Sequence, residues 1–229
     1  MNTLQEIFTK YVGTSFARQM ALADSMAEDT WEADLEAGTL NLGSHQYSAQ
    51  ILGSHAIAQN TWLWAWGNEQ AGFPKNSLEV AHRIRDFGIT NRIPELEERI
   101  INMENIDPHM LAMACTGIEP NTCYYPGAYD GGTAFLVITN PTQEILAPVK
   151  PERVSTVIMH VISTFEVNHR NFLDNFLTQQ GFEIIENHGK TVGKRDDGSV
   201  TVRFNASGLI EEVTGDIQPR KEKKSWWRL

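Results

Sequence analysis

The chain has 229 residues, of which 41% are hydrophobic and 21% charged, an ordinary globular composition that excludes collagenous, disulfide-rich and mostly disordered classes. Its 19 Lys and Arg against 29 Asp and Glu give a formal net charge of −10, which disfavours a nucleic-acid partner because an acidic surface repels phosphates. No segment approaches the roughly 20 apolar residues of a membrane span, and no apolar signal region opens the chain, so we expect a soluble, cytoplasmic protein.

The first elements in chain order are a helix and an antiparallel meander. A helical spacing of hydrophobic residues runs over residues 3–26, where Gly13 leaves open one helix or two short ones. From Thr30 to Asn68 the period changes to two, and over residues 31–36 apolar side chains alternate with acidic ones. The tetrapeptide L-G-S-H occurs at residues 42–45 and again at 52–55. A strand-to-turn junction repeated after ten residues favours a meander of strands, the last of them over residues 61–68.

The middle of the chain is rich in short helices. We expect these helices from Asn76 or Ser77 to Phe87 with Gly88 as the stop, from Pro94 with Leu96, Ile100 and Met103 on one face, and from Asp107 to Gly117. A loop with three tyrosines then leads into the apolar strand Thr133–Ile138, whose continuous apolar run is typical of a strand covered on both faces.

The last part of the chain repeats the order of helix and strands. One long helix is predicted from Pro151 to about Gln180, ended by Gly181, and residues 182–217 are strand-like, with turns at Asp197-Gly198 and Ser207-Gly208. The fold class is therefore α+β, with long helices packed on antiparallel meander sheets and a helix-rich middle connector. We expect one domain over residues 1–219; two similar halves, about 1–70 and 150–217, are the alternative.

Residues 220–229 form a basic tail. They carry five basic side chains and one acidic side chain, and they include Trp226 and Trp227. This tail either docks on the acidic body of the protein or contacts an anionic membrane, RNA or an acidic partner.

Two cysteines, Cys115 and Cys123, have the spacing C-x7-C, which fits neither a zinc knuckle nor a redox pair. We expect free thiols and no cofactor.

Three tryptophans, Trp62, Trp64 and Trp66, alternate along the last strand of the meander and so share one face of it. They form either a platform on which a ligand stacks or a ridge that packs under an amphipathic helix. The second interpretation is favoured because large aromatic side chains are mostly buried.

The sequence around these tryptophans, N-T-W-L-W-A-W-G-N over residues 60–68, resembles the signature of a bacterial family of unknown function that is marked by a W-L-W-A-W strand. The N-terminal helix, Ile51-Leu52-Gly53-Ser54 and the strand after Gly131-Gly132 are similar as well. The resemblance implies a bacterial, intracellular protein, and it implies no activity, cofactor or catalytic residue.

Two E-x-x-H pairs lie on predicted helices, Glu79 with His82 and Glu166 with His169. A carboxylate and an imidazole at this spacing share a helical face, and two such pairs contribute to the di-iron sites of helical bundles. They are the candidate metal ligands, and Glu166 with His169 is also a candidate acid–base pair. Hydrogen-bonded pairs at the edge of a core are the simpler interpretation.

The remaining candidate site is the tyrosine loop over residues 124–132. The rings and hydroxyls of Tyr124, Tyr125 and Tyr129, next to flexible glycines, are suited to lining a ligand pocket, or else they cover the end of a sheet.

The sequence thus predicts a non-catalytic module that binds a protein partner or a small molecule. The candidate ligand-binding residues are Tyr124, Tyr125, Tyr129, Trp62, Trp64 and Trp66. The alternative is an enzyme that uses Glu166 and His169; no catalytic residue is assigned otherwise.

Overall fold

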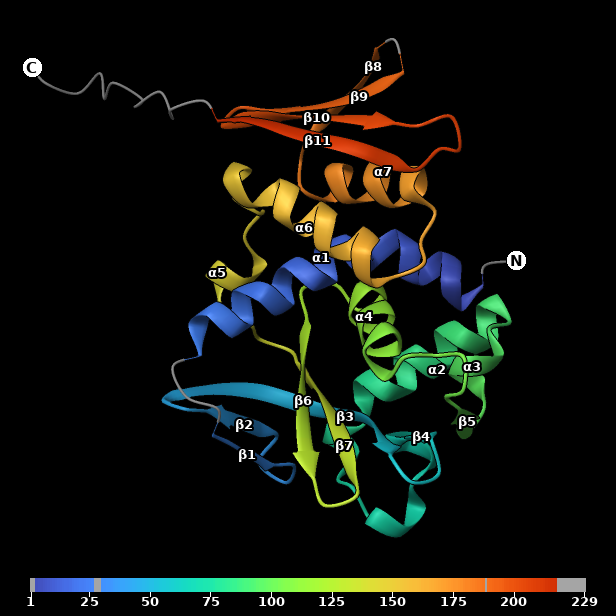
Figure 1. The fold of residues 1–229 in the computed structure, drawn as a ribbon. Helices are drawn as coiled ribbons and strands as arrows, with labels where there is room; N and C mark the ends of the chain where they lie inside the picture. Colours follow the sequence, from blue (N-terminus) through green and yellow to red (C-terminus); the bar gives the residue numbers. More distant parts are fainter. Residues whose placement is uncertain (1–2, 27–29, 188, 218–229) are drawn as a thin grey trace, which may run out of the picture. The chain divides into compact units, whose positions relative to one another are not determined.

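The computed structural model describes residues 3–26, 30–187 and 189–217, which group into two compact units, residues 1–147 and 148–229 (Figure 1). We refer to them as the N-terminal and C-terminal units. Both combine helices with antiparallel sheets, which confirms the α+β prediction. The C-terminal unit begins within two residues of the predicted second half, whereas the N-terminal unit is about twice as long as the predicted first half. The basic tail and its tryptophans lie outside the described residues.

The N-terminal unit opens with helix α1 (Leu4–Ser25), a single helix that runs through Gly13. Thr3 and Glu6 close a capping box at its start, which satisfies two backbone donors. Helix α1 packs against α4 (Pro108–Ile118), and Gly117 allows a close approach because a side chain there would collide with Tyr11.

The sheet of this unit has seven strands, all in antiparallel pairs. They are β1 (Trp31–Asp34), β2 (Thr39–Leu42), β3 (His45–Ala56), β4 (Thr61–Trp64), β5 (Ile100–Asn102), β6 (Cys123–Tyr129) and β7 (Gly132–Ile138). The meander β1-β2-β3-β4 agrees with the sequence-based prediction. The long strand β3 also pairs with β7, which continues to β6, so β3 is the centre of the sheet.

A bulge in β3 fixes which side chains lie on each face. Ile51 pairs with Leu136 and Gly53 pairs with Phe135, so Leu52 is the extra residue. On one face, Phe135 contacts Trp62 at 4.9 Å between ring centroids and His109 of α4 at 5.4 Å. On the other face, a second core includes buried residues of four strands, β2, β3, β6 and β7: Leu40, Leu42, Tyr47, Ala49, Ile51, Cys123, Leu136 and Ile138.

The strand predicted over residues 61–68 ends early. It stops at Trp64, and Ala65–Gly67 forms a short 3-10 helix, η1. Two further turns of this kind follow, η2 (Glu69–Ala71) and η3 (Lys75–Ser77). Trp66 therefore leaves the strand face, and its ring lies under the guanidinium of Arg85 at 4.4 Å.

Helix α2 (Glu79–Asn91) does not stop at Gly88 as predicted; it ends at Arg92, which adopts a positive φ of 57°. Gly88 serves packing instead, since a Cβ there would lie 2.5 Å from Cβ of Leu96 in α3 (Pro94–Glu97). The sequence predicts a helix from Pro94 that includes Ile100 and Met103, and this prediction is wrong beyond Glu97. Residues Ile100–Asn102 instead form strand β5 and pair with β4.

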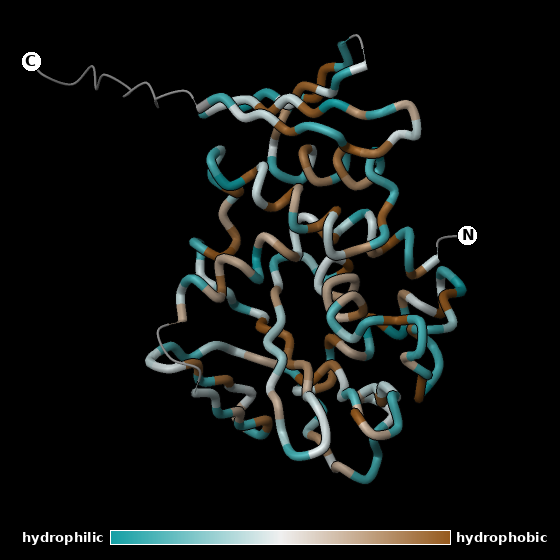
Figure 2. Tube along the Cα trace, in the orientation of Figure 1, coloured by the Kyte–Doolittle hydropathy of each residue, from teal (hydrophilic) through white to brown (hydrophobic). Residues whose placement is uncertain are grey.

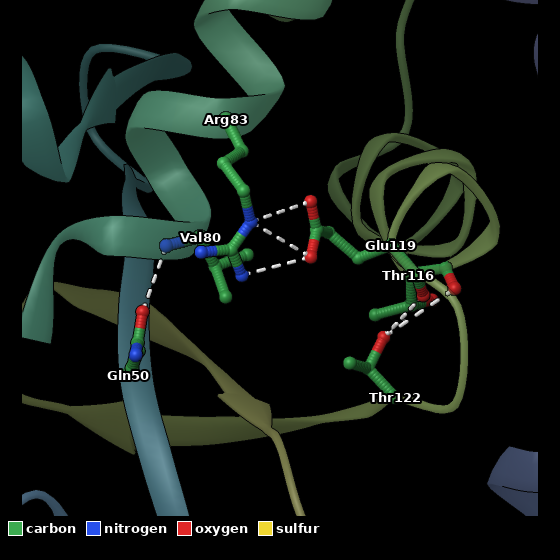
Figure 3. A network of polar contacts seen from close by, with 6 residues as sticks. All are labelled: Gln50, Val80, Arg83, Thr116, Glu119 and Thr122. Carbon is green, nitrogen blue, oxygen red and sulfur yellow. Dashed lines mark hydrogen bonds and ion pairs between the residues drawn. The ribbon is translucent and has the colours of Figure 1, made fainter.

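Polar side chains secure the ends of α2 and α4 (Figure 3). Gln50 of β3 accepts a hydrogen bond from the backbone N–H of Val80 at 2.7 Å, at a helix start that has no side-chain cap of its own. Arg83 of α2 forms a bidentate ion pair with Glu119, just after α4, and this hydrogen bond raises the pKa of Arg83. Thr122 donates to the carbonyl of Glu119 at 2.8 Å. The unit ends with the short helix α5 (Gln143–Leu146).

The C-terminal unit has two helices where the sequence predicted one. Helix α6 (Pro151–Thr164) and helix α7 (His169–Gln179) are separate because the side chain of Asn168 caps α7, accepting from the N–H of Asn171 at 3.0 Å. Figure 2 shows hydrophobic and hydrophilic residues interleaved along both helices, as amphipathic helices require. Their buried residues continue one helical pattern across the break: Val154, Val157, Ile158, Val161, Phe172, Leu173, Phe176 and Leu177.

The sheet of this unit has four antiparallel strands in the order β11-β10-β9-β8. They are β8 (Glu183–Asn187), β9 (Lys190–Arg195), β10 (Gly198–Phe204) and β11 (Ile210–Ile217). The hairpin predicted at Asp197-Gly198 is confirmed, and so is the turn at Ser207-Gly208. Arg195 joins the parts of the unit: it pairs with Asp197 and donates to the carbonyls of Gln180 and Val149.

Candidate functional site

The N-terminal unit contains an apolar cleft of about 310 Å³ on the sheet face opposite Trp62 and Phe135. Its lining comes from strands β1, β3, β4, β6 and β7 and from the segment after β4: Trp31, Ala33, Leu35, Ile51, Gly53, Ser54, Leu63, Ala65, Asn68, Phe73, Tyr129, Ala134 and Leu136. This volume is at the lower end of the range for small-molecule sites, and an apolar lining with a few polar groups is typical of them.

The floor of the cleft follows from strand register. Ile51 of β3 pairs with Leu136 of β7, and beyond the bulge Ser54 pairs with both Ala134 and Leu63 of β4. These side chains share a face because paired residues in an antiparallel sheet point to the same side. The bulge at Leu52 is what brings both Ile51 and Ser54 to this face, since three residues apart they would otherwise point to opposite sides.

One wall is strand β1 with the residue that follows it. Trp31 and Ala33 of β1 and Leu35 just after it line the cleft, while Glu32 and Asp34 between them are exposed. The indole of Trp31 packs on β6: its ring centroid lies 6.0 Å from that of Tyr125, and a Cβ on Gly127 would lie 2.7 Å from its Cη2 atom. Gly127 therefore provides the space that Trp31 occupies.

The other wall is the segment of 3-10 turns after β4, which contributes Ala65, Asn68 and Phe73. The turn between β1 and β2 closes toward this segment, where a Cβ on Gly38 would lie 4.0 Å from the side-chain nitrogen of Asn76. The cleft is thus bounded by two segments that lie some 40 residues apart in sequence.

The three predicted tyrosines lie in strand β6 rather than in a loop. Tyr129 lines the cleft and is 49% exposed, and Tyr125 contacts the cleft residue Trp31. Tyr124 lies on the opposite face, where its hydroxyl is 3.0 Å from Nδ1 of His109, and burial raises its pKa. The structure therefore brings Tyr129 and Tyr125 to the cleft and places Tyr124 in the core.

The tryptophans have a mainly structural environment. Trp62 and Trp64 are fully buried, and their ring centroids lie 5.5 Å apart. Nε1 of Trp64 donates a hydrogen bond to the carbonyl of Glu95 at 3.1 Å. Trp66 is half-buried beneath Arg85. From the sequence, the motif is either a platform on which a ligand stacks or a buried ridge. Trp62 and Trp64, being fully buried, correspond to the ridge.

The four candidate metal ligands divide between the two units. Glu79 and His82 are exposed on α2, and Glu166 is exposed in the segment between α6 and α7, not on a helix as predicted. His169 starts α7, and its Nδ1 accepts a hydrogen bond from the N–H of Ile210 at 2.9 Å. Burial lowers the pKa of His169. Among residues 3–26, 30–187 and 189–217, no three His, Cys, Asp or Glu side chains lie together as metal ligands would.

The two cysteines are free and buried. Burial raises the pKa of Cys123 to about 12, although the nearby Arg18 lowers it, and burial also raises that of Cys115. Both thiols are therefore poor nucleophiles at neutral pH.

Most of the cleft lining was not predicted from the sequence. The signal was present for Trp31, Ala33 and Leu35, whose alternation with acidic residues indicates a strand with one apolar face. For Ser54, Asn68 and Phe73 no local pattern exists, because they reach the cleft through the bulge in β3 and the turns after β4.

Within the described parts of the chain, no helix is both long enough and apolar enough to cross a membrane. Neither the curated proteins nor the solved structures gave a match to the sequence. A family model does match: DUF6882, described as a family of unknown function, over residues 5–141. This range holds almost the whole N-terminal unit, including every residue of the cleft, and more than half of the chain. The protein therefore belongs to the DUF6882 family of unknown function.

Proposed function

We propose that this protein is a non-catalytic binding module whose N-terminal unit holds a small, largely apolar molecule in the cleft. The observation that carries the proposal is the cleft itself: ten of its thirteen lining residues are apolar or glycine, and none is charged. Burying apolar surface there stabilises a complex by roughly 25 cal/mol per Å², without any reactive group. The half-buried Trp31 and Phe73 supply ring faces to such a molecule.

Catalysis by Glu166 and His169 has less support. Nδ1 of His169 accepts from the N–H of Ile210, so in the neutral ring Nε2 carries the proton and has no lone pair with which to act as a general base. The cytoplasmic location remains part of the proposal. It rests on the two buried free thiols, which a reducing compartment preserves.

The test uses the full chain and 2-naphthol, a flat, uncharged probe, in equilibrium dialysis. Saturable binding at one site per chain is expected. The variant Ala134→Phe places a ring on the cleft floor, and it is expected to weaken binding by at least about tenfold because the added ring occupies the site.

The matched control is Ala128→Phe, which adds the same ring at an exposed position of β6 outside the lining. This control is expected to bind 2-naphthol as the unchanged chain does. Absence of saturable binding, or equal binding by Ala134→Phe, would contradict the proposal.

A further inference from the structure

We propose that the cleft selects an amphiphile with a single uncharged hydrogen-bonding head, held with its head at Ser54 and Tyr129 and its apolar body between Trp31 and Phe73. This inference rests on the proposed binding function and specifies its ligand. It follows from the charge of the lining, from the order of residues along the strands and from the polar groups at one end.

The lining excludes a charged head. None of its thirteen residues is Lys, Arg, His, Asp or Glu. An ionised group that enters the cleft loses part of its hydration and gains no counter-charge, which weakens its binding. The acids that directly neighbour lining residues in the sequence are all exposed, and they add repulsion against an anion: Glu32, Asp34, Glu36, Glu69 and Asp130.

The polarity of the floor changes along the strands. Ile51 and Leu136 form one level of the sheet, and Ser54 and Ala134 form the next. One level further, Tyr129 pairs with Gly132 at the end of the β6–β7 hairpin. An amphiphile aligned with the strands therefore meets apolar side chains at one end and hydroxyl groups at the other.

The polar groups are available to a ligand. Across the described residues, the side chains of Ser54, Asn68 and Tyr129 have no hydrogen-bond partner within the protein. A hydroxyl both donates and accepts, so Ser54 and Tyr129 complement an alcohol, phenol, carbonyl or amide head.

Gly132 leaves room for the phenol of Tyr129. A Cβ on Gly132 would be 2.6 Å from the hydroxyl oxygen of Tyr129, so the ring lies close over a backbone that only glycine leaves open. The hydroxyl can therefore lie close to the backbone at the end of the β6–β7 hairpin even though the residue is 49% exposed.

Four naphthyl probes with one common body test the inference by equilibrium dialysis against the full chain at pH 7. They are naphthalene, 2-naphthol, 2-naphthoate and 2-naphthylmethylammonium. We expect 2-naphthol to bind at least about tenfold more tightly than either ion and at least about threefold more tightly than naphthalene.

The double variant Ser54→Ala/Tyr129→Phe removes both hydroxyls and keeps the apolar lining. It is expected to reduce the affinity for 2-naphthol to that for naphthalene and to leave naphthalene binding unchanged. The matched control is Ser44→Ala/Tyr11→Phe: Ser44 occupies the equivalent position in the other L-G-S-H repeat, and Tyr11 is a half-buried tyrosine of α1 that does not line the cleft.

Three other outcomes would contradict either the selectivity or the binding function itself. Equal binding of all four probes would overturn the selection of an uncharged head and leave the binding function intact. Tighter binding of the ammonium probe would overturn it in favour of attraction by the acidic neighbours. If no naphthyl probe binds saturably, the proposed function itself fails.

Discussion

At the scale of single residues, the contact between Gly127 and Trp31 decides the shape of the cleft. Trp31 closes one side only because Gly127 has no side chain; a Cβ there would lie 2.7, 2.8 and 2.9 Å from three atoms of the indole. Real Cβ atoms do not approach so closely, so the indole must move.

The variant Gly127→Ala is therefore expected to displace Trp31 and weaken 2-naphthol binding by at least about threefold, at a cost of about 1–2 kcal/mol in the free energy of unfolding. Equilibrium dialysis and urea unfolding measure the two effects. Ala128→Ser, at the exposed next residue, is the control and is expected to change neither. Unchanged affinity in Gly127→Ala would show that Trp31 does not shape the site.

A second residue-scale prediction concerns His169. Its pKa is lowered by burial, and its Nδ1 must stay unprotonated to accept from Ile210. The unfolded state therefore binds more protons than the folded state. The contribution of His169 to stability is complete above about pH 6.5 and is lost as the pH falls through its lower folded-state pKa.

The variant His169→Asn removes the titrating group and keeps an oxygen that can accept from Ile210. Urea unfolding between pH 7.5 and pH 5 is expected to show a smaller loss of stability for this variant than for the unchanged chain. His160→Gln, at an exposed residue of α6, serves as the comparison and is expected to keep the original pH dependence. Identical pH dependence in all three chains would contradict the assignment.

At the scale of elements, Arg195 links the start of the C-terminal unit to its sheet. Its guanidinium lies over the ring of Phe182 at 4.3 Å, forms a bidentate pair with Asp197 and donates to two backbone carbonyls, of Gln180 and Val149. Its side chain is 14% exposed, so these contacts are poorly screened by water.

Replacing Arg195 with Met is expected to lower the free energy of unfolding by about 3 kcal/mol, because two carbonyls and a carboxylate lose their charged partner. Arg203→Met is the matched control. Its ion pairs with Glu211 and Glu212 are about half-exposed, and their loss is expected to cost less than about 1 kcal/mol. Equal shifts of the urea midpoint in the two variants would refute the role of Arg195.

The boundary between α6 and α7 could not be predicted from the hydrophobic pattern. The buried residues of α6 and α7 keep one helical spacing from Val154 to Leu177, so the pattern predicts one helix. The cap formed by Asn168 interrupts it. A cap of this kind is a local hydrogen bond, and it cannot be predicted from the spacing of hydrophobic residues.

At the scale of the whole molecule, the net charge of −10 predicts a weak affinity for nucleic acid. In an electrophoretic shift assay at about 0.15 M salt, the full chain at about 10 µM is expected not to shift a short DNA or RNA duplex. The chain ending at Pro219 is the comparison, because removing residues 220–229 deletes a local charge of +4. A shift by the full chain alone would assign nucleic-acid contact to the basic tail.

The fold class could be predicted from the sequence because it depends on local periodicity. The helical period over residues 4–25 and the alternation over residues 31–34 and 39–42 are both present in the structure. Gly208, at a turn predicted from the sequence, adopts a positive φ of 77° in the structure. These features depend on residues only a few positions apart in the sequence, so they can be predicted without knowledge of the tertiary structure.

The cleft depended on the tertiary structure. Trp31 and Phe73 line one space only because strand register, the bulge at Leu52 and the two 3-10 turns before Phe73 bring them together. The sequence by itself determined the α+β class, the family, the acidic charge and the apolar face of β1. The tertiary structure alone decided that this face lines a cleft and that Trp62 and Trp64 are covered, since those outcomes depend on contacts between residues far apart in the chain.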